Sequence, residues 1–162
     1  MLSKEHTNLI QKLARQCLKR DVSLVTAESC TGGLLSSLLT QEAGSSKWFD
    51  RGFVTYSNNS KIDSLGVRGE TLENFGAVSQ EVANEMSTGA LKNSEANLGI
   101  SITGIAGPEG GSLTKPVGTV YFSIANQEEV VLEHKSNFDG SRETIRKESV
   151  IFVLNKLLNL TL

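Results

Sequence analysis

Two side chains that can act as nucleophiles stand next to each other in a short polar turn. The turn reads Ser29-Cys30-Thr-Gly-Gly, and it directly follows residues 24–28, which have high strand tendency. A turn from a strand into a helix directs short side chains off the end of a sheet. A serine hydroxyl or a cysteine thiol placed there is a candidate nucleophile. Alternation through the turn points Ser29 and Cys30 in different directions, so only one can attack, and the sequence alone does not choose between them.

The same turn is a candidate anion-binding site. The helix predicted over residues 34–42 leaves its first backbone N–H groups without partners, and we expect them to point at the same space. Gly32 and Gly33 have no Cβ, which lets a ligand approach the backbone closely. With Thr31, these glycines would hold an oxyanion. The alternative interpretation, a glycine-rich connection in which Thr31 caps the helix, is equally well supported by this stretch alone.

A serine nucleophile without a nearby histidine needs another base, and lysine is the usual substitute. The chain has only two histidines, His6 and His134, and neither lies near a motif. Lys61 follows a strand predicted over residues 52–56, so we expect it at the same sheet edge as Ser29. Partial burial and a helix N-terminus would lower its pKa from about 10.4 toward ~7–8, as a base near neutrality requires. A solvated surface lysine is the alternative.

Two further polar side chains accompany this pair. Tyr56, at the end of the same predicted strand, could relay or orient the proton, or it could be an ordinary strand-end tyrosine. Arg142 stands in the first turn of the last predicted helix, where a cation opposes the helix dipole by roughly a few tenths of a kcal/mol. A position that works against local preference often serves an anion such as phosphate. A surface salt bridge with Asp139 or Glu143 explains Arg142 equally well.

The elements that must position these residues alternate between strand and helix. This order predicts one domain over residues 1–162, an α/β fold with three α/β/α layers around a mixed sheet. Thr103 and Gly104 end the third strand, where such sheets collect their ligands. The irregular segment 104–116, which contains Gly107, follows; loops of that length are usually functional or mobile. Strands are predicted over residues 22–27, 52–56, 98–103, 117–125 and 130–138. Helices are predicted over residues 3–20, 34–42, 61–65 and 70–75, and two longer helices are predicted to begin after Ser79 and after Ser141.

Composition excludes several classes of protein. The net charge of −2 and the absence of a basic block argue against nucleic acid or an anionic membrane as partner. No apolar run approaches the ~20 residues of a membrane span, and the first residues lack the apolar stretch of a signal peptide. Cys17 and Cys30 do not suggest a disulfide framework, so we expect a cytoplasmic protein. The glycine-rich segment matches neither the phosphate-loop pattern nor Gly-x-Gly-x-x-Gly.

Several segments carry a resemblance to a known family, in the right order and over nearly the whole chain. They are Ala-Glu-Ser-Cys-Thr-Gly-Gly at 27–33, Asp-Arg-Gly-Phe-Val-Thr-Tyr-Ser-Asn at 50–58 with Lys61, Gly-Ala-Val-Ser at 76–79, Thr-Gly-Ile-Ala-Gly-Pro at 103–108, Lys-Pro-Val-Gly at 115–118, and Phe-x-Gly-x-Arg at 138–142. They resemble the CinA C-terminal domain family, whose stand-alone members include nicotinamide mononucleotide deamidases. With no N-terminal extension in the sequence, we expect the stand-alone form. The chain departs from the family pattern at Ser141, where many relatives have aspartate.

The resemblance implies hydrolysis of the carboxamide of nicotinamide mononucleotide to nicotinate mononucleotide and ammonia, in pyridine nucleotide salvage. It implies Ser29 as nucleophile, Lys61 as base with Tyr56 assisting, and Thr103 near the substrate. We also expect substrate contacts from Arg142 and from the glycine-rich loop at the phosphate. The turn residues Cys30, Thr31, Gly32 and Gly33, and the loop residues Gly104 and Gly107, complete the expected substrate-binding set.

No metal and no cofactor is expected, and the expected partners are the small-molecule nucleotide and further copies of the chain in a homo-oligomer. Two rival interpretations stay open. One is an amidase that uses Cys30 or acts on another amide. The other is a non-catalytic module that binds a nucleotide through the same turn and Arg142.

Overall fold

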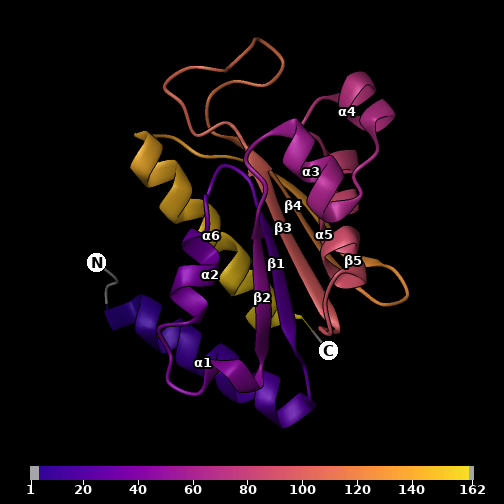
Figure 1. Ribbon diagram of the computed structural model, residues 1–162. Coiled ribbons are helices and arrows are strands. Elements are labelled where there is room, and N and C mark those ends of the chain that lie inside the picture. Colours follow the sequence, from indigo (N-terminus) through magenta and orange to yellow (C-terminus); the bar gives the residue numbers. More distant parts are fainter. Residues whose placement is uncertain (1–3, 161–162) are drawn as a thin grey trace.

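A computed structural model describes residues 4–160 of the chain. A five-stranded sheet in the order β2-β1-β3-β4-β5 forms its centre, and helices cover both faces (Figure 1). The first three strands in this order run parallel, and β4 and β5 are antiparallel additions on one side. The predicted three-layer α/β/α sandwich around a mixed sheet is therefore confirmed.

The elements follow the predicted alternation, with shifted ends. The strands are β1 (Leu24–Glu28), β2 (Phe49–Val54), β3 (Leu98–Gly104), β4 (Thr119–Asn126) and β5 (Val130–Asn137). The helices are α1 (Lys4–Arg20), α2 (Leu34–Leu39), the short 3-10 helix η1 (Ser45–Lys47), α3 (Asn58–Leu65), α4 (Gly69–Phe75), α5 (Gln80–Lys92) and α6 (Arg142–Asn159).

Two apolar layers hold the helices on the sheet. All five residues of β1 are buried, as expected for a central parallel strand. Successive side chains of a strand point to opposite faces, so Leu24 packs in the layer formed with α1, α2 and α6, whereas Val25 and Ala27 pack against α5. The sheet thus becomes a rigid platform whose strand ends can hold a site.

Several element ends differ from the predictions. α2 ends at Leu39 instead of residue 42, and Thr40 is its C-cap residue. β2 begins at Phe49 instead of residue 52, because Phe49 aligns in parallel with Leu24 of β1. α5 begins after Ser79 as predicted, and the backbone N–H of Val82 donates to the Ser79 hydroxyl. Residue 3, where the first helix was predicted to begin, lies outside the described residues.

The parallel strands β1, β2 and β3 place their carboxyl ends at one edge of the sheet, the upper end in Figure 1. β1 leads into the Ser29 turn, β2 leads into α3, and β3 leads into the long loop that rises above the sheet before β4. Residues far apart in the sequence therefore meet at this edge. Between residues 4 and 160, no helix has the length and apolar character needed to cross a membrane.

Candidate functional site

Ser29 and Lys61 are in direct contact at the carboxyl ends of the strands. Lys61 Nζ donates to Ser29 Oγ at 3.1 Å and to the carbonyl oxygen of Thr55 at 2.7 Å. Ser29 leaves the end of β1, and Lys61 lies in the first half of α3, whose start is fixed by a reciprocal capping box between Ser57 and Ser60. The two elements lie side by side because β1 and β2 are paired. The structure thus brings together the two residues that the sequence singled out as nucleophile and base.

Lys61 is buried, with 1% of its surface exposed, so it is not the solvated surface lysine of the alternative interpretation. Burial lowers the pKa of its amine below the ordinary value, because a charged ammonium loses its hydration there. Its hydrogen-bond partners are the hydroxyl of Ser29 and the carbonyl of Thr55, and neither is a carboxylate that would favour the charged form. A lowered pKa makes the neutral form of the amine more accessible, and the neutral amine can accept a proton.

Cys30, the rival nucleophile, lies in a different environment. It packs in the apolar layer with α1, α2 and α6 and is 6% exposed. Burial raises the pKa of its thiol to about 12. Since the thiolate is the reactive form of cysteine, this environment disfavours Cys30 as the attacking group.

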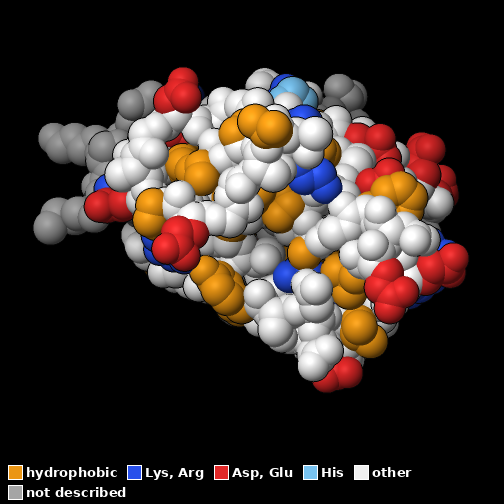
Figure 2. Space-filling view, turned by 90° about the horizontal axis from the view of Figure 1, so that it is seen from above, with side chains coloured by type: hydrophobic (Ala, Val, Ile, Leu, Met, Phe, Trp, Pro, Cys, Tyr) orange, Lys and Arg blue, Asp and Glu red, His pale blue; other side chains and the backbone are white. Residues whose placement is uncertain are grey.

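A cleft of about 280 Å³ opens over this pair. Figure 2, seen from this end of the strands, shows a hollow with basic side chains in and beside it and hydrophobic side chains around it. The cleft is lined by the ends of the strands and by the loops that follow them. Its lining residues are Ser29, Cys30, Tyr56, Asn58, Lys61, Ala77, Val78, Thr103, Gly104, Ile105, Ala106, Gly107, Glu109, Gly110 and Arg142.

Arg142, at the start of α6, bridges two walls of the cleft. Its guanidinium donates to the carbonyl oxygen of Gly107 at 2.8 Å and to the hydroxyl of Tyr56 at 2.6 Å. The salt bridges to Asp139 or Glu143 considered from the sequence do not form, and Glu143 pairs with Lys147 instead. Both acceptors of Arg142 are neutral, so its positive charge has no carboxylate partner within residues 4–160.

Tyr56 and Thr103 line the cleft, and the hydroxyl of each is already hydrogen-bonded to another cleft residue. Tyr56 is 60% exposed, and its hydroxyl accepts from Arg142. Thr103 is fully buried and donates to the carbonyl oxygen of Ala77 at 2.8 Å, which holds the segment before α5 against the cleft. Gly104 and Gly107 lie in the cleft wall as expected from the sequence.

The expectation of unpaired helix N–H groups in the turn is wrong, because the Glu28 side chain folds back over the start of α2. Its carboxylate accepts from the backbone N–H groups of Leu35 at 3.0 Å and Ser36 at 2.8 Å, and from the Ser36 hydroxyl at 2.8 Å. Glu28 is fully buried. Its negative charge at a helix N-terminus is favourable, but it leaves those N–H groups unavailable to a ligand. Glu28 was not predicted as a site residue, although a glutamate at the end of a buried strand is itself a signal.

Within the turn, Thr31, Gly32 and Gly33 are not among the cleft-lining residues. The Gly32 N–H donates to the Ser29 carbonyl at 3.0 Å. Gly33 precedes α2 in a left-handed conformation without a side-chain cap, and the buried Thr31 hydroxyl has no hydrogen-bond partner. The interpretation of Thr31 as a helix cap is therefore wrong. In the described part of the chain, the backbone N–H groups of Cys30 and Thr31 donate to no backbone carbonyl of another residue.

Arg146 also supports the turn and was not predicted. Its guanidinium donates to the Thr31 carbonyl at 2.9 Å, across 115 residues of sequence. A Cβ at Gly32 would lie 3.5 Å from the same guanidinium nitrogen. The four-residue spacing from Arg142 places both arginines on one face of α6 and was the available signal.

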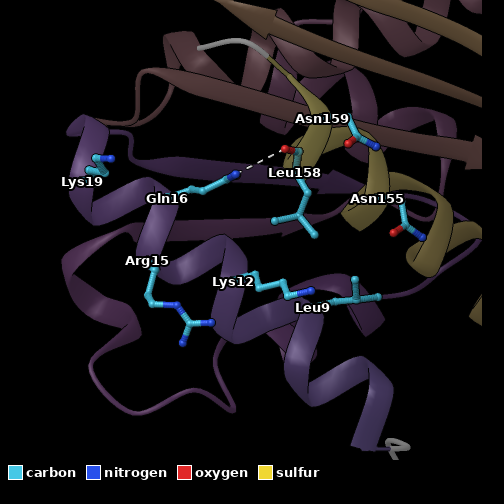
Figure 3. A pocket seen from close by; sticks show the side chains of 8 residues that line it. All are labelled: Leu9, Lys12, Arg15, Gln16, Lys19, Asn155, Leu158 and Asn159. Carbon is cyan, nitrogen blue, oxygen red and sulfur yellow. Dashed lines mark hydrogen bonds between the residues drawn. The ribbon is translucent and has the colours of Figure 1, made fainter.

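A second hollow, of about 510 Å³, lies between α1 and α6, at the end of the molecule away from Ser29 (Figures 1 and 3). Lys12, Arg15 and Lys19 line it together with amide side chains, and Gln16 donates to the Leu158 carbonyl at 3.4 Å. These basic side chains lie beside the last turn of α6, where cations suit the free carbonyl groups of a helix end. The residues that line it include no serine, threonine or cysteine. Within the described residues, no group of three or more His, Cys, Asp or Glu side chains is placed to hold a metal ion.

Comparison with known proteins identifies the family of this chain. The family model for the CinA C-terminal domain matches residues 6–161. The chain belongs to the CinA C-terminal domain family. The resemblance seen in the sequence is therefore confirmed.

Two relatives of this CinA chain carry an enzyme name. The nicotinamide-nucleotide amidohydrolase PncC of Enterobacter agglomerans is 52% identical over 132 residues, which cover 82% of this chain and 80% of the relative. The protein of the same name from Escherichia coli K12 is 45% identical over 97% of this chain and 95% of its own length. The crystal structure of the competence/damage inducible protein CihA from Agrobacterium tumefaciens superposes with a TM-score of 0.94 at 44% identity, covering 99% of both chains.

Proposed function

We propose that this protein is a nicotinamide-nucleotide amidohydrolase, which hydrolyses the carboxamide of nicotinamide mononucleotide to nicotinate mononucleotide and ammonia. The relatives named for this activity support the substrate. The observation that carries the mechanism is the contact of the buried Lys61 amine with the Ser29 hydroxyl at 3.1 Å. The proposed reaction belongs to pyridine nucleotide salvage, as the resemblance in the sequence implies.

In the first step, the neutral amine of Lys61 accepts the proton of the Ser29 hydroxyl. Ser29 Oγ attacks the carboxamide carbon, and the C=O electron pair moves to the oxygen. The amine gains a charge in this step, and its contact with the Thr55 carbonyl stabilises the ammonium that forms. A Ser–Lys pair needs no histidine and no metal for this proton transfer.

The negative oxygen of the tetrahedral intermediate needs hydrogen-bond donors. The backbone N–H groups of Cys30 and Thr31 suit this role, because neither donates to a backbone carbonyl in the described part of the chain. The N–H that follows a nucleophilic serine serves in this way in other hydrolases. In hydrolases, each such donor lowers the activation free energy by about 3 kcal/mol. The N–H groups of Gly32, Leu35 and Ser36 are engaged elsewhere and take no part.

In the second step, the C–N bond breaks and ammonia leaves with the proton that Lys61 holds. The nicotinoyl group remains bound to Ser29 Oγ as an ester. Lys61 then takes a proton from water, the hydroxide attacks the ester carbon, and Ser29 regains its proton as the nicotinate product leaves. The sum is one amide and one water converted to one carboxylic acid and one ammonia.

Arg142 is the proposed phosphate contact. Its charge faces the cleft without a carboxylate partner, and the glycine-rich wall at Gly104 and Gly107 lets the nucleotide approach the backbone. Tyr56 holds the guanidinium in place through its hydroxyl. Its expected assistance in proton transfer stays a prediction.

Ammonia release from nicotinamide mononucleotide tests the proposal, with wild type, Ser29→Ala and Lys61→Ala measured side by side. We expect release by the wild type and loss in both variants, while all three bind the nucleotide. Binding without release by the wild type would instead support the non-catalytic module. Full activity of Ser29→Ala would remove Ser29 as the nucleophile and leave an amidase of another kind.

A further inference from the structure

The cleft over Ser29 is lined by charged side chains of both signs, Glu109 and Arg142. We infer that Glu109 forms a cation subsite in this cleft and binds the positively charged pyridinium ring of the substrate, while Arg142 serves the anionic end. This inference rests on the proposed function, because a pyridinium nucleotide is the substrate that the function assigns.

Glu109 is the only carboxylate among the cleft-lining residues of the described chain, and Arg142 the only guanidinium. The described salt bridges join Arg51 to Asp50, Arg68 to Glu85 and Lys147 to Glu143, so the two cleft charges do not pair with each other. Opposite charges that share a space of about 280 Å³ without pairing favour a ligand that carries both signs.

The loop that carries Glu109 is held by hydrogen bonds at its base and at its far side. The N–H of Gly118 donates to the Ile105 carbonyl at 2.8 Å and closes the base of the loop. Lys115 Nζ donates to the Phe75 carbonyl at the end of α4, at 2.8 Å. A Cβ at Gly111 would lie 2.8 Å from the backbone nitrogen of Val117, so a glycine is needed for the loop to fold back this closely. These contacts hold the Glu109 side of the loop beside the cleft.

Nicotinamide mononucleotide has the required charge pattern. Its ring nitrogen is quaternary and positive at every pH, and its phosphate is negative. The carboxamide lies on the ring, so binding the ring also places the carboxamide carbon within reach of Ser29. The reduced nucleotide, with a 1,4-dihydropyridine ring, has nearly the same shape and the same phosphate, but its ring is neutral. Glu109 is expected to distinguish the two forms.

Binding measurements test this independently of amide reactivity. Dissociation constants for the oxidised and reduced mononucleotides are measured by calorimetry in Ser29→Ala and in Ser29→Ala/Glu109→Gln, at low ionic strength. Glu128→Gln in the same background is the matched control, since Glu128 lies in the β4–β5 turn, away from the cleft. We expect Glu109→Gln to raise the dissociation constant of the oxidised nucleotide about five-fold, because a solvent-exposed charge pair contributes little. The dissociation constant of the reduced nucleotide should not change.

Equal weakening of both nucleotides would overturn the subsite, since it would show a structural role of the loop. No weakening of either, or no binding of the oxidised nucleotide, would overturn it as well. Wild-type ammonia release separates this inference from the proposed function. If the wild type releases ammonia but Glu109→Gln leaves the ratio of the dissociation constants of the two nucleotides unchanged, only the subsite is contradicted. If Glu109→Gln changes that ratio but the wild type releases no ammonia, the subsite is supported and the amidohydrolase function is contradicted.

Discussion

Lys61 and Ser29 are joined by a 3.1 Å contact through which the amine, once neutral, can accept the serine proton. A neutral amine has two N–H groups and one lone pair. One N–H is directed to the Thr55 carbonyl at 2.7 Å, so the lone pair can turn toward the Ser29 hydroxyl. The carbonyl therefore orients the base for accepting the serine proton.

The pH profile follows from the pKa of Lys61. Burial lowers this pKa, and the reaction needs the neutral amine, so kcat/KM should rise with pH as Lys61 loses its proton. The midpoint of the rise should lie below the ordinary value of 10.5. Initial rates of ammonia release between pH 5 and pH 10 measure it. A flat profile over this range would contradict Lys61 as the base.

Replacing Lys61 with methionine should separate activity from stability. We expect at least a ~100-fold loss of ammonia release, because general-base catalysis contributes about 10²–10⁴-fold. We expect at most a loss of about 1–3 kcal/mol in the free energy of unfolding at pH 7, because methionine avoids the cost of burying an amine but leaves the Thr55 carbonyl without its donor.

The pH dependence of stability provides the control for that variant. The folded-state pKa of Lys61 is lowered, so between that value and 10.5 the unfolded chain binds a proton that the folded chain does not. The free energy of unfolding of the wild type should therefore rise with pH in this window, and that of Lys61→Met should lack this rise. Urea unfolding at pH 7 and pH 10 compares the two, and equal pH dependence would contradict a lowered pKa.

The choice of nucleophile is tested by two neighbouring alanine variants. Ser29→Ala should abolish ammonia release, whereas Cys30→Ala should retain it, since burial holds the thiol pKa at about 12. Cys30→Ala leaves a small cavity in the apolar layer with α1, α2 and α6, so its cost should appear as a destabilisation of about 1 kcal/mol. Thermal unfolding measures that cost. Loss of activity in a fully folded Cys30→Ala would argue for the thiol.

Much of the fold and the central pair of the site could be predicted from the sequence. The alternation of strands and helices predicts the layers, and residues that follow parallel strands meet at one sheet edge, as Ser29 and Lys61 do. The supporting contacts could not be predicted, because they depend on side-chain directions and strand order. Glu28 folds over α2, and Arg146 reaches the turn across 115 residues. Neither contact follows from local propensity.

Glu28→Gln should destabilise the fold. The carboxylate accepts from two backbone N–H groups and a hydroxyl at the start of α2, and an amide cannot replace both oxygens as acceptors. A buried N–H left without an acceptor costs about 1–3 kcal/mol, so we expect a loss of that size in the free energy of unfolding. Urea unfolding measures it. Glu128→Gln in the exposed β4–β5 turn is the control and should change stability by less than about 0.5 kcal/mol, and an equal effect of the two variants would contradict the role of Glu28.

Arg146 is expected to act on the rate through the turn that carries Ser29. Its guanidinium holds the Thr31 carbonyl at 2.9 Å but does not line the cleft. Small displacements of reacting groups cost up to about 100-fold in rate, so Arg146→Gln should lower kcat by about 10- to 100-fold with little change in KM. Arg142→Gln, which touches the cleft itself, should chiefly raise KM.

The contrast between the two arginines on α6 makes the test specific, because both variants remove one charge from the same helix. Arg15→Gln, in the hollow between α1 and α6, controls for the loss of a positive charge elsewhere and should leave both constants unchanged. Thermal unfolding of each variant shows that the molecules assayed are folded. If Arg146→Gln raised KM and left kcat unchanged, Arg146 would contact the nucleotide directly. The Ser29 turn would then hold its geometry through Glu28 and the sheet alone.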